Sequence, residues 1–288
     1  MKRVRRSEII AFLLLILALA AAIAQEFQRG GSNRDRRDWE RVRSQRRYDP
    51  RKGVEMWELP ETLPDDVFTF ARVKYDSYGR SRRGGNWQTD WPDSDLNFSM
   101  RLEQLTSLRV SPTGAIVELT DPELSQYPFL YMIEPGRISL TDPEREALRN
   151  HLLHGGFLMV DDFWGFREWD YFYEEIKQVF PNREPEEIPI EHEIFSCVFD
   201  IKEKPQIPAI QVALWYGITY EPDKAGSEEV HYKALYDDAG RMMAIICHNT
   251  DLGDGWEREG EDPWYFRNFS EPKAYPMGIN IVFYALTH

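Results

Sequence analysis

The chain has 288 residues, of which 42% are hydrophobic and 14% aromatic, so it is long and apolar enough to bury a sizeable core. Its formal net charge is −14 at pH 7. From Gly53 onward there are 21 Lys or Arg and 43 Asp or Glu, a net charge of −22. A surface this acidic excludes nucleic acid as a partner, because phosphate binding needs positive potential.

Residues 1–24 have the composition of a secretory signal peptide. A basic start is followed by an unbroken apolar run over residues 9–24, which ends in Ala22-Ile23-Ala24 before Gln25. Small residues two apart are typical of a signal-peptidase site. An uncleaved anchor is the alternative, although the run is short of the roughly 20 apolar residues of a membrane span. Either interpretation predicts export, to the periplasm or to the outer face of the inner membrane.

Residues 25–52 differ in composition from the rest of the chain. They contain ten Lys or Arg, five Asp or Glu and few aliphatic residues, which predicts a disordered basic linker. A basic arm that touches anionic lipid headgroups is the alternative. We expect any membrane contact to be confined to residues 1–52, and residues 53–288 to form a single α/β domain.

The first half of this domain predicts alternating strands and helices. A strand is expected over residues 68–75, followed by a long polar loop over 76–95. The helix expected over 96–108 would place Phe98, Leu102 and Leu105 on one face. Extended segments are expected over 115–119 and 128–133.

The segment over residues 140–162 has the clearest local signals. Thr141 and Glu144 have the spacing of a capping box, and Gly155 with Gly156 ends the helix that they begin. The apolar strand that follows ends at Asp161-Asp162. A fully apolar strand after a helix is typical of a parallel sheet covered on both faces.

The second half is less regular. We expect a helix over residues 168–180, extended or irregular structure over 188–201 and 207–220, a hairpin over 230–247 and a final helix over 275–287. The order of elements predicts an α/β fold with a Rossmann-like, doubly wound, mostly parallel sheet, helices on both faces and long loop insertions.

An arginine- and glycine-rich loop is the first candidate ligand-binding site. Guanidinium groups and glycine-freed backbone N–H groups can bind an anion. The residues are Arg80, Arg82, Arg83, Gly84, Gly85 and Trp87, with Trp164 from a later loop. The alternatives are a mobile loop whose arginines pair with nearby carboxylates, and tryptophans that pin loops to the core.

Four residues are candidates for catalysis: Asp161, Asp162, His192 and Asp251. Adjacent carboxylates at a strand end suit metal binding or acid–base chemistry, because burial would split their pKa values. The alternative for Asp161 and Asp162 is that one caps the next helix or turn while the other faces water. Asp251 and the residues after it also resemble an ordinary turn.

Several kinds of site lack their motifs. His192 has no second His at zinc-protease spacing, and no Gly-x-Ser-x-Gly elbow supplies a nucleophile. We therefore expect no metal and no cofactor. Cys197 and Cys247 are the only cysteines, and we expect two buried thiols, with a disulfide as the alternative.

An ordered succession of short motifs resembles the bacterial domain of unknown function 4159, from Phe68 to the C-terminus. The resemblance implies a class I glutamine amidotransferase-like, flavodoxin-like fold, and some relatives attach the domain to a membrane-anchored aerotolerance-type module. It also implies that Asp161-Asp162 stands where a nucleophilic Cys would be expected. The motifs are Phe70-x-Arg72-Val73-x-Tyr75, Gly84-Gly85-Asn86-Trp87, Tyr127-Pro128-Phe129-Leu130-Tyr131, Leu148-Arg149, Gly155-Gly156-Phe157-Leu158-x-x-Asp161-Asp162, His192-x-Ile194-Phe195, Asp251-Leu252 and Gly278-x-Asn280-x-x-x-Tyr284-Ala285.

Three hypotheses about function follow. The first is a non-catalytic envelope module whose strand-end cleft binds an anionic small molecule, a glycan or a protein partner. The second is a metal-dependent or acid–base hydrolase that uses Asp161, Asp162, His192 and Asp251. The third is a structural subunit of a membrane-associated complex. Convergence of the four side chains distinguishes the second hypothesis from the first.

Overall fold

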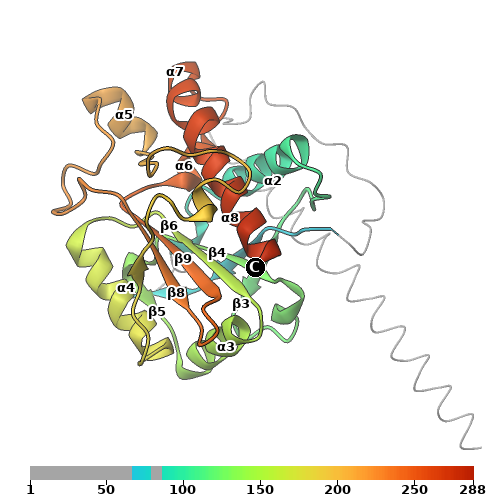
Figure 1. The fold of residues 1–288 in the computed structure, drawn as a ribbon. Helices are drawn as coiled ribbons and strands as arrows, with labels where there is room; N and C mark the ends of the chain where they lie inside the picture. The colour runs from blue at the N-terminus through green and yellow to red at the C-terminus, as the bar shows by residue number, and fades with distance from the viewer. Residues whose placement is uncertain (1–66, 79–85) are drawn as a thin grey trace, which may run out of the picture. The chain divides into compact units, whose positions relative to one another are not determined.

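The computed structural model describes residues 67–78 and 86–288. This part of the chain forms a seven-stranded sheet in the order β3-β1-β4-β6-β9-β8-β7 (Figure 1). The first five strands in that order are parallel, while β8 runs antiparallel to both β9 and β7. The strands are β1 (Ala71–Lys74), β3 (Ala115–Glu118), β4 (Phe129–Ile133), β6 (Phe157–Asp161), β7 (Glu186–Glu187), β8 (His231–Tyr236) and β9 (Met242–His248). The predicted α/β class with a mostly parallel sheet is confirmed.

The direction in which the chain winds reverses between β1 and β4. From β1 the chain passes through α2 (Asp93–Leu105) to β3 on one side, and then returns to β4 on the other side of β1. The later parallel strands β6 and β9 continue outward from β4. A doubly wound sheet has such a reversal, and ligands bind in the crevice that it opens at the carboxyl ends of the strands.

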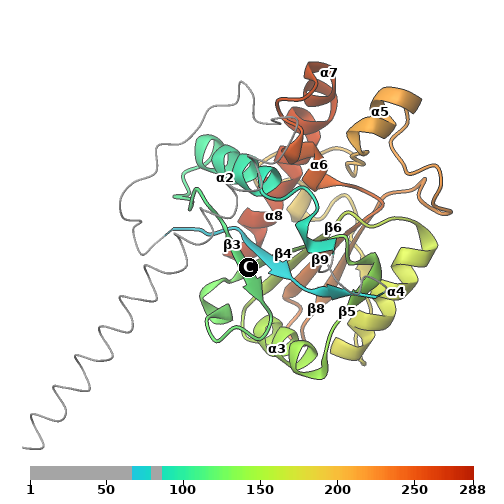
Figure 2. The ribbon, with the colours of Figure 1, turned by 180° about the vertical axis from the view of Figure 1, so that it is seen from behind.

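Each face of the sheet has its own hydrophobic core, because successive side chains along a strand point to opposite faces. Phe70 and Tyr131 belong to the core that contains residues of α2, α6 and α8, whereas Leu130 and Leu158 belong to the core beneath α3 and α4. Figures 1 and 2 show these two groups of helices on opposite sides of the sheet. The helices are α3 (Asp142–Leu153), α4 (Gly165–Val179), α6 (Leu252–Glu257) and α8 (Tyr275–Thr287).

The capping box predicted for α3 is present. The Thr141 side chain accepts a hydrogen bond from the Glu144 backbone N–H, and the Glu144 carboxylate accepts one from the Thr141 backbone N–H at 2.7 Å. Gly155 adopts a φ of 106° after the helix ends, and the fully buried β6 follows. Local sequence signals therefore position the strand that carries Asp161.

The structure departs from the sequence pattern in three places. Leu105 does not share the buried face of Phe98 and Leu102 but is 51% exposed, because it is the last residue of α2. Residues 207–220, expected to be extended or irregular, contain the helix α5 (Ile210–Tyr216). The turn-like sequence after Asp251 forms α6, whose Trp256 is fully buried among aromatic rings.

The remaining elements are short, apart from one π-helix. β2 (Asp76–Ser77) pairs antiparallel with β5 (Ile138–Ser139). The π-helix η5 (Phe266–Ala274) joins α7 (Pro263–Tyr265) to α8. The 3-10 turns are η1 (Asn86–Gln88), η2 (Leu124–Gln126), η3 (Pro135–Arg137) and η4 (Glu193–Phe195).

The predicted leader over residues 1–24 and the linker over 25–52 lie outside the described residues. Across residues 67–78 and 86–288, no helix combines the length and apolar character needed to cross a membrane. Both cysteines are free thiols, but the prediction that both are buried is right only for Cys247. Cys197 is exposed, because it lies in the irregular segment that follows η4.

Candidate functional site

The candidate site lies where β1, β4, β6 and β9 end. These strands are neighbours in the sheet and parallel, so the segments that follow them meet at one edge. Asp161 is the last residue of β6, and Asp251 follows β9 by three residues. The Asp162 backbone N–H donates to the Thr250 carbonyl at 3.2 Å, which joins the turn after β6 to the segment after β9.

Backbone strain is concentrated at this edge. Among the described residues, four that are not glycine have φ between 49° and 60°: Asp90, Glu134, Asp162 and Asn249. They lie in the loop after β1 and directly after β4, β6 and β9. The left-handed conformation is uncommon outside glycine and clusters at functional sites, where the surrounding structure must hold it. The strain therefore marks the three strand ends that carry buried acids, those of β1, β6 and β9, together with the end of β4.

Hydrogen bonds hold these turns in place. The Tyr75 hydroxyl donates to the carbonyls of Ile133 and Glu134, at 2.6 and 2.8 Å. The Asn249 side-chain oxygen accepts from the Gly165 N–H at 2.8 Å, and its amide group donates to the carbonyl of Gly226 at the same distance. Tyr75 thus braces the turn after β4, and Asn249 joins the segments that follow β6 and β9.

Three aspartates from three different segments form what we term the strand-end carboxylates: Asp90, Asp162 and Asp251. One oxygen of each lies within 4.8 Å of an oxygen of the others. Their exposed fractions are 9%, 8% and 5%. None of the three forms an ion pair with a described basic residue, and the Oδ2 atom of Asp90 has no hydrogen-bond partner among the described residues.

Burial and mutual repulsion disfavour the charged forms of these groups. Desolvation raises the pKa of each of the three carboxyls, and nearby acids raise it further. For Asp251 the repelling groups include Asp162 and Asp90, so members of the cluster raise one another's pKa. Lys224 lowers the pKa of Asp162, but its ammonium group pairs with Glu168 at 3.0 Å.

Asp161 lies beside the strand-end carboxylates and is fully buried. Its Oδ2 accepts hydrogen bonds from the Gly253 N–H at 3.0 Å and the Tyr131 hydroxyl at 3.1 Å, while its Oδ1 has no partner among the described residues. Burial raises the pKa of Asp161 to about 7, although these hydrogen bonds oppose the rise. A carboxyl group with this pKa can exchange protons near neutral pH.

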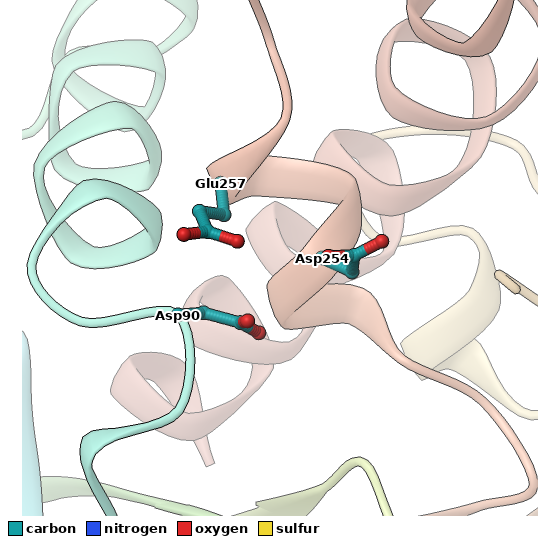
Figure 3. A group of neighbouring side chains, drawn as sticks. All are labelled: Asp90, Asp254 and Glu257. Carbon is teal, nitrogen blue, oxygen red and sulfur yellow. The ribbon is translucent and has the colours of Figure 1, made fainter. Parts of the chain in front are cut away.

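A second group of acids shares Asp90 with the first. We term Asp90, Asp254 and Glu257 the helix carboxylates, because two of them belong to α6; their oxygens also lie within 4.8 Å of one another. In Figure 3, Asp90 reaches from the segment that enters α2 toward α6, and Glu257 points from α6 into the same gap. The Arg258 Nε lies 2.8 Å from both Asp254 Oδ1 and Glu257 Oε2. This group therefore has a cation of its own.

Arg72 supports the loop that carries Asp90. The guanidinium is fully buried beneath this loop, where it bonds Asp95 and donates to the carbonyls of Trp87 and Thr89, both at 2.9 Å. Burial disfavours the charged form, but Asp95 raises the pKa of Arg72 above its usual value. The side chain is permanently charged and holds the segment just before Asp90 against β1.

The structure brings together three of the four predicted catalytic residues. Asp161, Asp162 and Asp251 meet at the strand ends. His192 instead accepts a hydrogen bond from the Ile194 N–H and packs against Tyr284 of α8, with ring centroids 5.4 Å apart. Neither Asp161 nor Asp162 caps α4 or faces water, because the helix begins after Trp164 and both carboxyls are buried.

The predicted ligand-binding residues divide into two sets. Arg80, Arg82, Arg83, Gly84 and Gly85 lie outside the described residues. Trp87 and Trp164 are buried, at 7% and 2% exposure. The Trp164 Nε1 donates to Asp162 Oδ1 at 2.9 Å, and Trp87 packs against Trp91. Both tryptophans thus support the segments around the site.

The sequence motifs include Arg72 and Tyr131 but assign neither a role, and no sequence pattern predicted Asp90, Asp254 or Glu257 as site residues. Asp90 lies in the loop that was predicted to bind ligand only through its arginines and glycines. Asp254 lies in a segment that was interpreted as a turn. A buried Arg within a strand is unusual, because a buried charge needs a partner. Arg72 was therefore the one sequence feature that could have indicated a buried acidic partner nearby. Nothing local in the sequence links Asp90 to Asp251.

A comparison with curated proteins found no match to this chain. The chain does match a family model, described as a domain of unknown function (DUF4159), over residues 69–286. This range covers both helix layers, every strand of the sheet and all the carboxylates of the site. The chain therefore belongs to the DUF4159 family.

Proposed function

We propose that this domain binds a divalent cation through the strand-end carboxylates, Asp90, Asp162 and Asp251. The observation that carries the proposal is the approach of three buried carboxylates, from three separate segments, with no basic partner among the described residues. Mg²⁺, Ca²⁺ and Mn²⁺ prefer carboxylate and other oxygen ligands. A bound cation would offset the repulsion that raises the pKa values of these groups.

The cation centre departs from the sequence-based expectation that the protein holds no metal. That expectation rested on zinc motifs, which combine His and Cys at fixed spacing. An all-oxygen site assembled from distant loops has no comparable local motif, so its absence from the sequence pattern carries little weight.

The proposal retains ligand binding as the primary activity. Hard cations keep open positions for water or for an anionic ligand, and the arginine-rich loop over residues 79–85 remains a predicted source of further anion contacts. An anionic small molecule or glycan would then bind through the cation. A protein partner in the envelope remains the alternative ligand.

The experiment is titration of the EDTA-treated, dialysed full chain with Mg²⁺, Mn²⁺ and Ca²⁺ by calorimetry, with thermal unfolding followed in parallel. We expect one tightly bound ion per chain and a higher melting temperature. Asp162→Asn and Asp251→Asn should each weaken binding by more than about tenfold, because each removes a charged ligand. Asn suits both positions. It tolerates the positive φ of Asp162, and it can replace Asp251 as the N-cap of α6, whose side chain accepts the Asp254 N–H.

Asp200→Asn is the matched control, because Asp200 is exposed and pairs only with Lys202 among the described residues. It should bind the cation as the unmodified chain does. Failure of all three ions to bind at millimolar concentration would reject the proposal. So would binding that survives both Asp162→Asn and Asp251→Asn.

A metal-dependent hydrolase is the second candidate, and one observation favours it. Asp161 has a pKa of about 7 and an oxygen without a described hydrogen-bond partner, beside the proposed cation site. A group of this kind can accept a proton from a cation-bound water. This version keeps Asp161, Asp162 and Asp251 in the site and omits His192.

The hydrolase candidate is tested with Mn²⁺ and panels of phosphate and carboxylate esters. Turnover should require the cation and should fall by roughly 10²–10⁴-fold in Asp161→Asn, the contribution typical of a general base. Cation affinity should be retained in that variant. Turnover that is unchanged by Asp161→Asn would reject this role.

Two further parts of the proposal rest on the sequence. Export to the periplasm or the outer face of the inner membrane follows from the leader, and N-terminal sequencing of the exported protein tests it. The class I glutamine amidotransferase-like relationship is supported by the resemblance and by Asp162, whose φ of 54° lies in a strand-to-helix turn like that of a nucleophile elbow. An experimental structure compared with that class tests the relationship.

A further inference from the structure

Arg258 sits over the helix carboxylates. It follows the last residue of α6, and its side chain is 22% exposed. The Nε atom lies 2.8 Å from Asp254 Oδ1 and 2.8 Å from Glu257 Oε2, and an Nη1 bond to Glu261 holds the far side of the guanidinium at 3.0 Å. One positive charge is therefore fixed against two buried acids.

Asp90 connects this arrangement to the strand-end carboxylates. It belongs to both groups of mutually close oxygens, is 9% exposed, and has an Oδ2 atom without a hydrogen-bond partner among the described residues. Figure 3 shows it directed toward α6 and the other helix carboxylates. A carboxylate shared by two adjacent oxygen clusters is the arrangement found where two metal ions lie about 3.5–4 Å apart.

We propose that Arg258 is a built-in cation that occupies the second of two adjacent cation positions, so that the centre takes a single divalent ion. This inference rests on the proposed function, because it requires a cation at the strand-end carboxylates. Asp254 and Glu257 then serve Arg258 and are closed to a metal. Removal of the guanidinium opens a second position lined by Asp90, Asp254 and Glu257.

The alternative occupant of this position is a second divalent ion, with Arg258 displaced toward solvent. The contacts favour the guanidinium. Asp254 Oδ2 also accepts the Ile210 N–H at 2.5 Å, so the carboxylate is oriented from both sides, and Arg258 is held by three acids at once. Charged pairs with several hydrogen bonds of this kind are stronger than single exposed pairs.

The test uses the full chain and Mn²⁺, with stoichiometry from calorimetry and the coupling of bound ions from electron paramagnetic resonance. The unmodified chain should bind one Mn²⁺, with a mononuclear spectrum, even at millimolar Mn²⁺. Arg258→Met and Arg258→Gln should each bind two, and the two ions should show the spin coupling of neighbouring Mn²⁺. Arg258→Lys keeps a positive charge and should remain at one.

The outcomes separate this inference from the proposed function. No Mn²⁺ bound to the unmodified chain rejects the proposed function itself. One Mn²⁺ in the unmodified chain and still one in folded Arg258→Met and Arg258→Gln overturns the inference alone. Two coupled ions in the unmodified chain also overturn it, and that measurement needs no variant, so the inference stays testable if both substitutions prevent folding.

Discussion

The strand-end carboxylates and the helix carboxylates share Asp90 and are similarly buried, yet they differ in what surrounds them. Arg258 lies against the helix carboxylates, and the two α6 acids have a fixed cation within 2.8 Å. Asp162 and Asp251 have no ion pair with a described residue, and their pKa values are raised well above the usual range. Acids that the fold itself neutralises are structural, whereas acids that it buries and leaves without a cation indicate a ligand.

The two groups also differ in backbone conformation. Of the residues that belong to one group alone, Asp162 is held in the left-handed conformation, whereas Asp254 and Glu257 lie in an ordinary helix. A strained turn persists only if its surroundings enforce it, and Asp162 combines this strain with repulsion from neighbouring acids. The following predictions test or sharpen the difference between the two groups.

Loss of Arg72 should have the largest effect, because it disturbs both groups through Asp90. Arg72→Met leaves Asp95 buried without its charge partner and frees the carbonyls of Trp87 and Thr89. Breaking one side of a buried pair costs about 3–5 kcal/mol, measured as the free energy of unfolding in urea. Cation affinity should fall as well.

The double variant Arg72→Met with Asp95→Leu is the control for this prediction. It removes both charges, so it should be more stable than Arg72→Met alone while its cation affinity stays low. Unchanged stability of Arg72→Met would mean that the buried pair does not hold the loop.

The same substitution should have opposite effects in the two groups. In EDTA, Asp162→Asn should stabilise the fold by about 1 kcal/mol, because the Asn oxygen still accepts from Trp164 while one repelling charge disappears. Asp254→Asn should destabilise by about 2 kcal/mol, because an amide nitrogen must then face either the Ile210 N–H or Arg258. Unfolding free energies in urea measure both effects. If both substitutions changed stability in the same direction, the proposed difference between the two groups would be wrong.

Substitution of two glycines in α6 distinguishes an effect on Asp90 from the general cost of overpacking the core. A Cβ atom at Gly253 would lie 2.6 Å from Asp90 Oδ2, whereas at Gly255 it would lie 2.5 Å from the Ala274 Cβ. Each Gly→Ala change should cost about 1–3 kcal/mol. Only Gly253→Ala should also lower the affinity for the cation, by more than about tenfold. Calorimetry measures this affinity. Equal cation affinity in the two variants would place Asp90 outside the centre.

Glu187 is a reference acid outside both groups and should give the smallest effect. Burial alone would raise its pKa, but hydrogen bonds from His231, Lys204 and Lys233 lower the pKa to about 2. The folded value lies below the unfolded value of about 4.3, so the stabilisation is present above about pH 4.3 and is lost as the pH falls toward 2.

Glu187→Gln should therefore lower the free energy of unfolding at pH 7 by less than about 1 kcal/mol, since the side chain is partly exposed. The difference from the unmodified chain should shrink toward zero near pH 2 in urea titrations. A constant difference across this range would show that the carboxylate charge is not the cause.

Much of the fold could be predicted from local signals. The capping box of Thr141 and Glu144, the apolar strand that ends at Asp161 and the hairpin of β8 and β9 are all as expected. α5 and α6 could not be predicted in this way, because their helical form depends on contacts such as the burial of Trp256 rather than on propensity.

By itself, the sequence determined the acidic character of the domain, the α/β class and the presence of two aspartates at the end of a buried strand. Those properties follow from composition and from periodicity within single segments. Only the tertiary structure decided that Asp90 joins Asp162 and Asp251, that His192 lies elsewhere and that Arg258 neutralises a neighbouring group. The physical reason is that parallel strands bring distant segments to one edge, and no local pattern records which carboxylates will meet there or which of them will find a cation.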